Sequence, residues 1–263
     1  MLGGGLTIRQ VTIQASAAMK SERIDVLLVQ RGLCDTREQA KRLILAGEVR
    51  SGDRVIDKAS TKLVLDAELS LKKKLKYVGR GGFKIEGALD GFGIDPSGWI
   101  CMDVGASTGG FTDCLLQRGA LKVHAIDVGT NQLVWKLRND SRVISKEQFN
   151  ARNLKPEDVG ETIRLAVMDL SFISLTKVLP AVFSVMADDG MVVPLIKPQF
   201  ELSRQEVARG GIVREPELHD KAIAKIRNFI DQQDGWEWRG VMSSPIKGSD
   251  GNREFLAWLV KRS

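Results

Sequence analysis

The sequence is poor in the residues that build disulfide, zinc and imidazole sites. Its 263 residues include three cysteines, Cys34, Cys101 and Cys114, and two histidines, His124 and His219. An odd number of cysteines without Cys-x-x-Cys spacing argues against a disulfide framework or a zinc site, and it favours a cytoplasmic protein. Two histidines far apart in sequence argue against an enzyme built on imidazole. We therefore expect no metal.

Long apolar runs are also missing. No run approaches the roughly 18 residues of a membrane span, so we expect no membrane partner. Residues 1–18 contain three successive glycines and lack the basic start and apolar block of a signal peptide. We expect this segment to be a disordered tail. The remaining length can bury one full core and a smaller satellite domain.

The net charge of +6 lies in one short region. Residues 19–80 hold 15 Lys or Arg against 9 Asp or Glu, whereas the rest of the chain is balanced at 24 against 24. Such an asymmetry indicates a surface for a polyanion, most simply a nucleic acid. The alternative is a solvated, lysine-rich surface.

The basic region has the pattern of a small α+β domain. Apolar positions predict a helix over residues 23–30 that ends at Gly32. A second helix follows the capping-box sequence Thr36-Arg-Glu-Gln39 and ends at Gly47. Residues 49–55 predict two short strands around a Ser-Gly-Asp turn. Lysines at 72–74 and 76, with glycines around Arg80, predict a basic linker over residues 72–82.

Beyond the linker, the most informative segment is Asp103–Asp113, with the sequence Asp-Val-Gly-Ala-Ser-Thr-Gly-Gly-Phe-Thr-Asp. An apolar run enters it and an amphipathic run leaves it, which predicts a strand, a turn of small residues and a helix. Gly105 and Gly109 allow a ligand to approach the main chain. The alternative is a tight turn that binds nothing.

The ligand of this turn is expected to carry a positive charge. A dinucleotide fingerprint would place a third glycine where Ser107 stands, and the Asp103 carboxylate would repel a pyrophosphate. A carboxylate suits an ammonium or sulfonium group, and S-adenosylmethionine has both. Asp127 ends the next strand about twenty residues further on, where such folds bind ribose hydroxyls.

Strand and helix signals alternate through the rest of the chain. Strands are predicted at residues 99–103, 123–127, 163–169 and 191–197, which indicates a doubly wound parallel sheet. Two later strands, at 236–242 and 255–260, predict an antiparallel pair. Asp169 and Lys197 fall at strand ends, where ligands bind in such sheets. A lysine that concludes an apolar run loses hydration, which favours the neutral amine and a role as general base. The alternative is a lysine that extends to solvent.

Two resemblances to known families follow from these motifs. Arg23–Leu33, Thr36–Ile44 and Gly47–Val49 resemble the alpha-L RNA-binding motif of the ribosomal S-four type. Five further motifs are similar to the TlyA family, namely Tyr77–Lys84, Asp103–Asp113, Asp169–Ser174, Lys197–Glu201 and Gly251–Glu254. One departure is Leu75-Lys-Tyr-Val78, where relatives commonly show Arg-x-Trp-Val. The similarity covers about residues 19–261.

The TlyA resemblance implies fold, activity and partners. It implies an alpha-L domain over residues 19–71 and an FtsJ-like methyltransferase domain over residues 83–263, with a Rossmann-like α/β sheet. The implied activity is S-adenosylmethionine-dependent methylation of cytidine 2′-oxygens in ribosomal RNA, and the implied partners are that RNA or ribosomal subunits. The sequence alone does not say which ribosomal RNA is modified.

The site residues expected from motifs and resemblance form three groups. The catalytic group is the tetrad Lys84, Asp169, Lys197 and Glu254. The cofactor-binding group is Asp103, Gly105, Ala106, Ser107, Gly109, Asp127, Glu147 and Phe149, the last two near the adenine. The RNA-binding group is Arg23, Arg37, Lys41, Arg42 and Arg80.

Two rival functions use the same features differently. A non-catalytic RNA-binding assembly factor would keep the fold without the chemistry, but the complete tetrad argues against it. A membrane-active hemolysin, a name that some relatives carry, would need an amphipathic or spanning segment, and none is evident.

Overall fold

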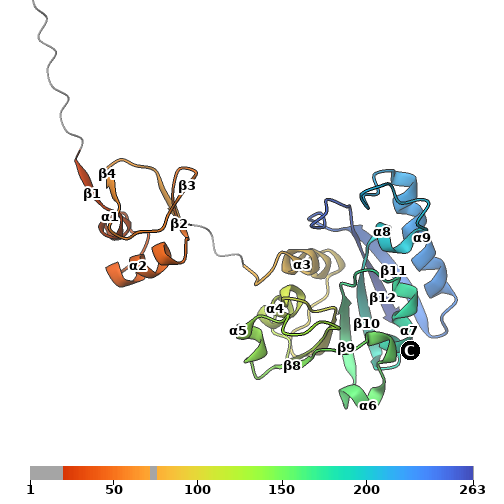
Figure 1. Cartoon of the computed structure of the whole chain (residues 1–263). Coiled ribbons are helices and arrows are strands. Elements are labelled where there is room, and N and C mark those ends of the chain that lie inside the picture. Colours follow the sequence, from red (N-terminus) through yellow and green to blue (C-terminus); the bar gives the residue numbers. More distant parts are fainter. Residues whose placement is uncertain (1–19, 72–75, 263) are drawn as a thin grey trace, which may run out of the picture. The chain divides into compact units, whose positions relative to one another are not determined.

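The structure is a computed structural model that describes residues 20–71 and 76–262. The chain divides into two compact units, Met1–Lys74 and Leu75–Ser263 (Figure 1). The expected tail at residues 1–18 lies outside the described residues, and so does the part of the expected linker at residues 72–75.

The first unit packs two helices against short strands. Its elements are β1 (Ser21–Arg23), α1 (Ile24–Gln30), α2 (Arg37–Leu45), β2 (Val49–Ser51), β3 (Arg54–Ile56), β4 (Lys62–Val64) and β5 (Leu69–Leu71). Strand β1 pairs with β4, and the other strands form a sheet in the order β3-β2-β5. The small apolar core of this unit contains Ile24, Leu28 and Ile44 from the two helices.

The start of α2 shows why its sequence forms a helix. The Thr36 hydroxyl accepts a hydrogen bond from the Gln39 amide at 3.2 Å, which satisfies an otherwise free donor. The Gln39 side chain accepts from the amide of Asp35 at 3.1 Å. The expected capping box would return this bond to Thr36 instead, so the observed cap reaches one residue further back. Gly47, at φ 67°, follows the helix end.

The second unit is a doubly wound α/β sheet. Its elements are α3 (Gly81–Phe92), β6 (Ile100–Val104), α4 (Gly110–Gln117), β7 (Lys122–Ile126), α5 (Trp135–Arg138), β8 (Val143–Lys146), η1 (Ala151–Asn153), α6 (Pro156–Val159), β9 (Ile163–Met168), η2 (Leu175–Lys177), α7 (Leu179–Phe183), β10 (Met186–Ile196), α8 (Pro198–Glu201), α9 (Pro216–Asp231), β11 (Trp236–Ser243) and β12 (Phe255–Lys261). The strand order is β11-β12-β10-β9-β6-β7-β8. Pairing is parallel from β10 to β8, and β12 is antiparallel to both of its neighbours.

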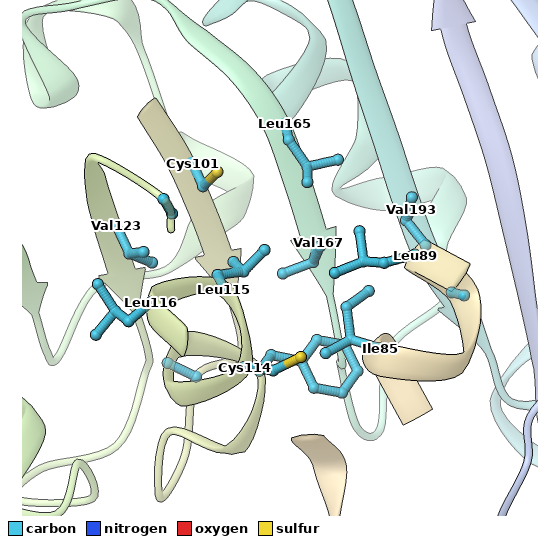
Figure 2. Close-up of a cluster of buried hydrophobic side chains, with 14 of the residues drawn as sticks. Ile85, Leu89, Cys101, Cys114, Leu115, Leu116, Val123, Leu165, Val167 and Val193 are labelled. Atoms are coloured by element: carbon cyan, nitrogen blue, oxygen red, sulfur yellow. The ribbon is translucent and has the colours of Figure 1, made fainter. Parts of the chain in front are cut away.

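Alternate residues of the central strands bury two separate cores. One face carries Cys101, Leu165 and Val167, which pack against α3 and α4 (Figure 2). The opposite face carries Met102, Ala166 and Met168, which pack with residues of α7 and α9. A strand covered on both faces has to be apolar throughout, which explains the continuous apolar runs in the sequence.

Two boundaries differ from the sequence-based expectation. Strand β10 begins at Met186 rather than Met191, and its pairing with β9 shifts register between these residues. The expected linker included Gly81 and Gly82, but α3 begins at Gly81. A Cβ at Gly82 would overlap the Tyr77 ring. Gly82 thus serves close packing at this helix start rather than a flexible bend.

Candidate active site

The sheet places a crevice at the carboxyl ends of β6 and β9. After β6 the chain proceeds to β7 and β8 on one side, and it then returns to β9 and β10 on the other. Helices after these neighbouring strands therefore leave in opposite directions and open a space between them, which is where doubly wound sheets bind ligands. Two cavities lie there, of about 240 Å³ and 350 Å³, and both are lined by Gly105, Ser107 and Asp169.

Asp103 lies on the floor of the smaller cavity with one unused oxygen. Its side chain is fully buried, and Oδ2 accepts bonds from the amide and the hydroxyl of Thr112 at 2.9 and 2.7 Å. Oδ1 is buried and accepts no hydrogen bond from any residue that the structure describes. Burial raises the pKa of Asp103 to about 7, because the charged form has lost its water. A ligand cation would satisfy this oxygen.

The turn after β6 exposes main chain to the same space. Gly105 has φ 87°, and a Cβ on it would overlap the carbonyl oxygen of Asp169. Ala106 follows it and lines the smaller cavity. Ser107 also has positive φ, at 47°, and its amide donates to Asp127 Oδ2 at 2.8 Å. At Gly105 the turn after β6 therefore packs directly against the main chain of Asp169, which only a glycine allows.

Gly109 lies outside the lining of both cavities. Its φ is 97°, and a Cβ would overlap Leu133 and Leu137, which pack over the start of α4. Of the expected cofactor residues, this glycine therefore meets the core rather than the space for a ligand.

The larger cavity is lined by two carboxylates, Asp127 and Asp169, by a few other polar side chains and by several apolar groups. Asp127 accepts amide bonds from Ser107 and Gly129 at 2.8 and 2.7 Å, which fixes its carboxylate at the rim. Ile126, Phe149 and Leu170 supply apolar walls. A flat, largely apolar group with hydroxyls attached, such as an adenosine, fits this lining.

Glu147 does not line either cavity. Its carboxylate accepts bonds from the amides of Asn131, Gln132 and Leu133 and from Arg138. These bonds hold the loop between β7 and α5, and the amide bonds also keep the pKa of Glu147 low. The two residues expected near the adenine are therefore separated by the structure, and only Phe149 faces the cavity.

The four expected catalytic residues meet in the smaller cavity. Lys197 Nζ lies 2.5 Å from Asp169 Oδ1, and Lys84 Nζ lies 3.9 Å from Asp169 Oδ2. Lys84 Nζ also lies 2.6 Å from Glu254 Oε2. The four side chains are between 3% and 22% exposed, so these ion pairs are shielded from water. Burial raises the pKa of Glu254, and the neighbouring Lys84 ammonium opposes that shift.

Strand pairing explains how residues so distant in sequence come together. Asp169 follows β9 and Lys197 follows β10, and the two strands run parallel with Met168 opposite Pro194. Strand β12 runs the other way, and its first residue, Phe255, pairs with Ile196. Glu254 is thereby placed at the same sheet edge as Lys197, and α3 brings Lys84 to them.

Sequence analysis missed three residues that support this site. Ser171 accepts a bond from Lys197 Nζ at 3.2 Å. Glu201 accepts from the Ser174 hydroxyl and the Leu175 amide at 2.5 and 2.8 Å, which ties the segment after Asp169 to α8. Asn252 is fully buried, and its amide group bonds to the main chain of Val213 and Gly211. All three lie inside motifs already singled out, so their position was a usable signal.

The expected RNA-binding residues of the first unit differ in how they are engaged. Arg23 and Arg37 both bond to buried Asp25, at 2.9 and 2.8 Å. Their guanidinium groups lower the pKa of Asp25 to about 2. Lys41 pairs with Glu38 at 2.8 Å on the same helix face, and Arg42 is exposed.

In the second unit, Arg80 is exposed at the start of α3 and lines the smaller cavity. Its guanidinium donates to the Lys247 carbonyl at 3.4 Å. Across residues 20–71 and 76–262, no group of three or more His, Cys, Asp or Glu side chains is arranged to hold a metal ion. Within the same ranges, no helix has the length and apolar character to cross a bilayer.

Comparison with known proteins identifies both units. Residues 77–261 match the FtsJ-like methyltransferase family, and residues 22–69 match the S4 domain. The 16S/23S rRNA (cytidine-2′-O)-methyltransferase TlyA of Mycobacterium tuberculosis is 44% identical over 245 residues, which cover 90% of this chain and 89% of that protein. Hemolysin A of Brachyspira hyodysenteriae is 44% identical over 241 residues, covering 90% of this chain and 99% of that protein.

A solved structure shows the same likeness in three dimensions. A candidate hemolysin from Streptococcus thermophilus superposes with a TM-score of 0.70 at 48% identity, covering 94% of this chain and 90% of that one. The family match covers most of the chain, and the relatives are similar along nearly their whole length. The chain therefore belongs to the FtsJ-like methyltransferases and to the group of its TlyA relatives, and it joins the methyltransferase domain to an S4 domain.

Proposed function

We propose that this chain methylates the 2′-oxygen of cytidine in ribosomal RNA, with S-adenosylmethionine as donor. The observation that carries the proposal is that Asp169 lines both cavities and pairs with Lys197. Asp169 thus lies between the cavity suited to an adenosine and the cavity that holds the catalytic tetrad. The proposed substrate follows from the name of the TlyA relative of Mycobacterium tuberculosis, a 16S/23S rRNA (cytidine-2′-O)-methyltransferase. The proposed place of action is the cytoplasm, where ribosomes are assembled.

The cavities fit S-adenosylmethionine on three observations. The unpartnered Oδ1 of Asp103 suits the amino group of the methionine part. Gly105 lines both cavities, and its close contact with the Asp169 carbonyl leaves no room for a side chain, so its main chain borders the space for the ligand. Asp127 and Phe149 suit the ribose and the adenine. When bound, this cofactor supplies a methyl group on a positively charged sulfur, which is reactive without further activation.

The tetrad then has two tasks, alignment and proton removal. Lys197 is the proposed base for the ribose hydroxyl, and Asp169 holds its ammonium at 2.5 Å. Lys84 lies 3.9 Å from the other oxygen of the same carboxylate. Glu254 compensates Lys84 at 2.6 Å and fixes its position. In its neutral form Lys197 would accept the proton of the ribose hydroxyl, and the cofactor, when bound, would supply the methyl group that the hydroxyl oxygen receives.

An exposed aromatic ring lies at the larger cavity. Phe172 follows Asp169 closely in sequence, has φ 64° and is 90% exposed. Its ring lies 5.1 Å from that of Phe200 and lines the larger cavity. Unstacked bases in single-stranded RNA bind to such rings. Together with the basic S4 unit, this ring supports RNA as the substrate rather than a small molecule.

The test is transfer of a radiolabelled methyl group to ribosomal subunits that lack this modification, followed by mapping of the 2′-O-methyl positions. We expect label at cytidine 2′-oxygens with the wild-type chain. Lys197→Met should give none, and the matched control Lys155→Met, on an exposed lysine paired with Glu157, should label normally. Binding of S-adenosylmethionine without any transfer to ribosomal RNA would contradict the proposal and favour a non-catalytic RNA-binding factor.

A further inference from the structure

A third cavity lies beside the candidate active site and has a strongly cationic lining. Its volume is about 430 Å³, and its lining includes Arg214, Lys247 and Arg253 but no Asp or Glu. All three side chains are exposed. None forms an ion pair with any residue in the described part of the chain, where most other cations around the second unit are paired. Three uncompensated cations around one hollow attract an anion.

The segments that line this cavity are joined by buried, hydrogen-bonded groups. Asn252 Oδ1 accepts from the Val213 amide at 2.8 Å, and Asn252 Nδ2 donates to the Gly211 carbonyl at 2.9 Å. The buried ring of His219 bonds through Nε2 to the Val213 carbonyl at 3.0 Å. These bonds fasten the segment carrying Arg214 to the loop carrying Lys247 and Arg253. The main chain that carries the three cations is therefore fixed around the cavity, and their side chains are exposed.

Nearby carboxylates are engaged elsewhere. Glu215, next to Arg214 in sequence, accepts a bond from the Arg214 amide at 3.1 Å and does not line the cavity. Asp250 accepts from the Asn252 side chain at 2.9 Å and from Gln199 at 3.3 Å. Glu215 lies close enough for the Arg214 charge to contribute to its lowered pKa, but neither carboxylate lines the cavity or forms an ion pair with the three cations, so the lining remains cationic.

The cavity adjoins the smaller catalytic cavity at one shared residue. Lys247 lines both this cavity and the smaller catalytic cavity, and its carbonyl accepts the bond from Arg80. The same loop ends at Glu254 of the tetrad. A chain of negative charges that leaves the catalytic cavity past Lys247 would therefore meet Arg253 and Arg214 next.

We propose that this cavity, named here the Arg214–Arg253 pocket, binds a backbone phosphate of the substrate RNA next to the nucleotide whose ribose enters the catalytic cavity. The inference rests on the proposed function and adds a binding site to it. Arginine is suited to the task because its planar group donates two parallel hydrogen bonds to phosphate oxygens. Binding of this phosphate positions the target ribose, and it requires no particular base.

The experiment compares the full-length double variant Arg214→Gln/Arg253→Gln with a control that removes the same charge. The control is Arg227→Gln/Arg262→Gln. Arg262 follows the last residue of β12, which pairs with the first residue of β11 at the end of the sheet away from Glu254. Arg227 lies in the last turns of α9. RNA affinity is measured against salt concentration, S-adenosylmethionine affinity by calorimetry, and methyl transfer as kcat and KM for RNA.

We expect the pocket variant to bind RNA about tenfold more weakly, with the salt slope of log affinity reduced by about 1. KM for RNA should rise by a similar factor, while kcat at saturating RNA and cofactor affinity stay within about twofold of the control. RNA affinity and salt slope equal to those of the control would overturn the proposal. So would a variant that loses binding of inorganic phosphate but keeps RNA affinity, because the pocket would then serve a free anion.

The two proposals fail in different ways. If wild-type protein transfers no methyl to ribosomal RNA but the pocket variant still loses RNA affinity and salt slope, the pocket stands and the proposed reaction falls. If transfer is normal in both variants with equal KM, the reaction stands and the pocket falls. A thermal midpoint shared by both variants shows that neither result comes from unfolding.

Discussion

Each unit of this chain contains a carboxylate held between two cations, and the cations differ. In the first unit Asp25 lies between Arg23 and Arg37. In the second unit Asp169 lies between Lys197 and Lys84. Arginine keeps its proton at all accessible pH values, whereas a lysine in a shielded site can release it. The first arrangement is thus a fixed brace, and the second can carry out proton transfer.

The surroundings reinforce this difference. Arg23 and Arg37 are 40% and 56% exposed, so their outer faces remain free for a polyanion while they brace Asp25. Lys84 and Lys197 are only 10% and 11% exposed and face a cavity. Shielding from water makes each charge around Lys197 count more, because the effective dielectric is lower. Under the proposed function, the same arrangement of charges serves stability in one unit and proton transfer in the other.

The largest expected effect comes from making the second arrangement like the first. Lys197→Arg keeps the positive charge beside Asp169 but cannot accept the hydroxyl proton. We expect methyl transfer to fall by a factor of about 10² to 10⁴, the usual contribution of a positioned base, with cofactor affinity within about twofold of wild type. Single-turnover transfer and calorimetry measure the two quantities. Activity within threefold of wild type would show that Lys197 acts only as a charge.

A smaller effect is expected when Lys84 loses its compensating carboxylate. Glu254→Gln keeps the size of the side chain but leaves the Lys84 ammonium without its 2.6 Å partner. The Lys84 ammonium should then move toward Asp169 and weaken the ion pair between Asp169 and Lys197. We expect kcat, measured at saturating RNA and cofactor, to fall about 10- to 100-fold. An unchanged rate would remove Glu254 from the tetrad.

The Asp103 carboxylate should make cofactor binding depend on pH. Its pKa of about 7 is raised above the unfolded value near 4, so the empty fold is stabilised at low pH and loses that stabilisation as pH rises toward 7. The ammonium of the cofactor needs the charged form. Cofactor affinity should therefore fall about tenfold for each pH unit below 7 and level off above it.

Asp103→Asn should bind the cofactor about tenfold more weakly at pH 8 and lose this pH dependence. Calorimetry between pH 5.5 and 8 checks both expectations. The control is Asp140→Asn, whose carboxylate precedes the start of β8, pairs with Arg142 and lines neither cavity. An identical pH profile for wild type and Asp103→Asn would contradict the proposed role of Oδ1.

The smallest effect is expected in the first unit. Asp25→Asn removes the brace between Arg23 and Arg37 and should lower the stability of residues 20–71 by about 1 kcal/mol, because both arginines are well solvated. The pKa of Asp25 is lowered to about 2, so its stabilisation is present above pH 4 and is lost as pH falls toward 2. Amide hydrogen exchange on the full chain measures the change. Methyl transfer at saturating RNA should stay normal.

Sequence patterns located the parts of the site that lie at strand ends. Asp103, Asp169 and Lys197 could be placed together because carboxyl ends of parallel strands share one edge of a sheet. Lys84 and Glu254 came only from family resemblance, since a helix and an antiparallel strand bring them in through tertiary packing. No local pattern in the sequence shows that packing.

The differences between expectation and structure have physical causes. Gly109 and Gly105 both have positive φ, and only three-dimensional contacts show that Gly109 packs against Leu133 and Leu137. Glu147 and Phe149 are two residues apart, yet Glu147 is used by loop amides. The Arg214–Arg253 pocket escaped sequence analysis for the same reason, because its cations come from two segments joined by buried Asn252.

The most direct test of the account is a crystal structure with S-adenosylhomocysteine bound. The account predicts the amino group within hydrogen-bonding distance of Asp103 Oδ1, the ribose at Asp127, and the sulfur facing Lys197 across Asp169. A ligand bound elsewhere, or a Lys197 side chain turned to bulk water with the ligand in place, would contradict it.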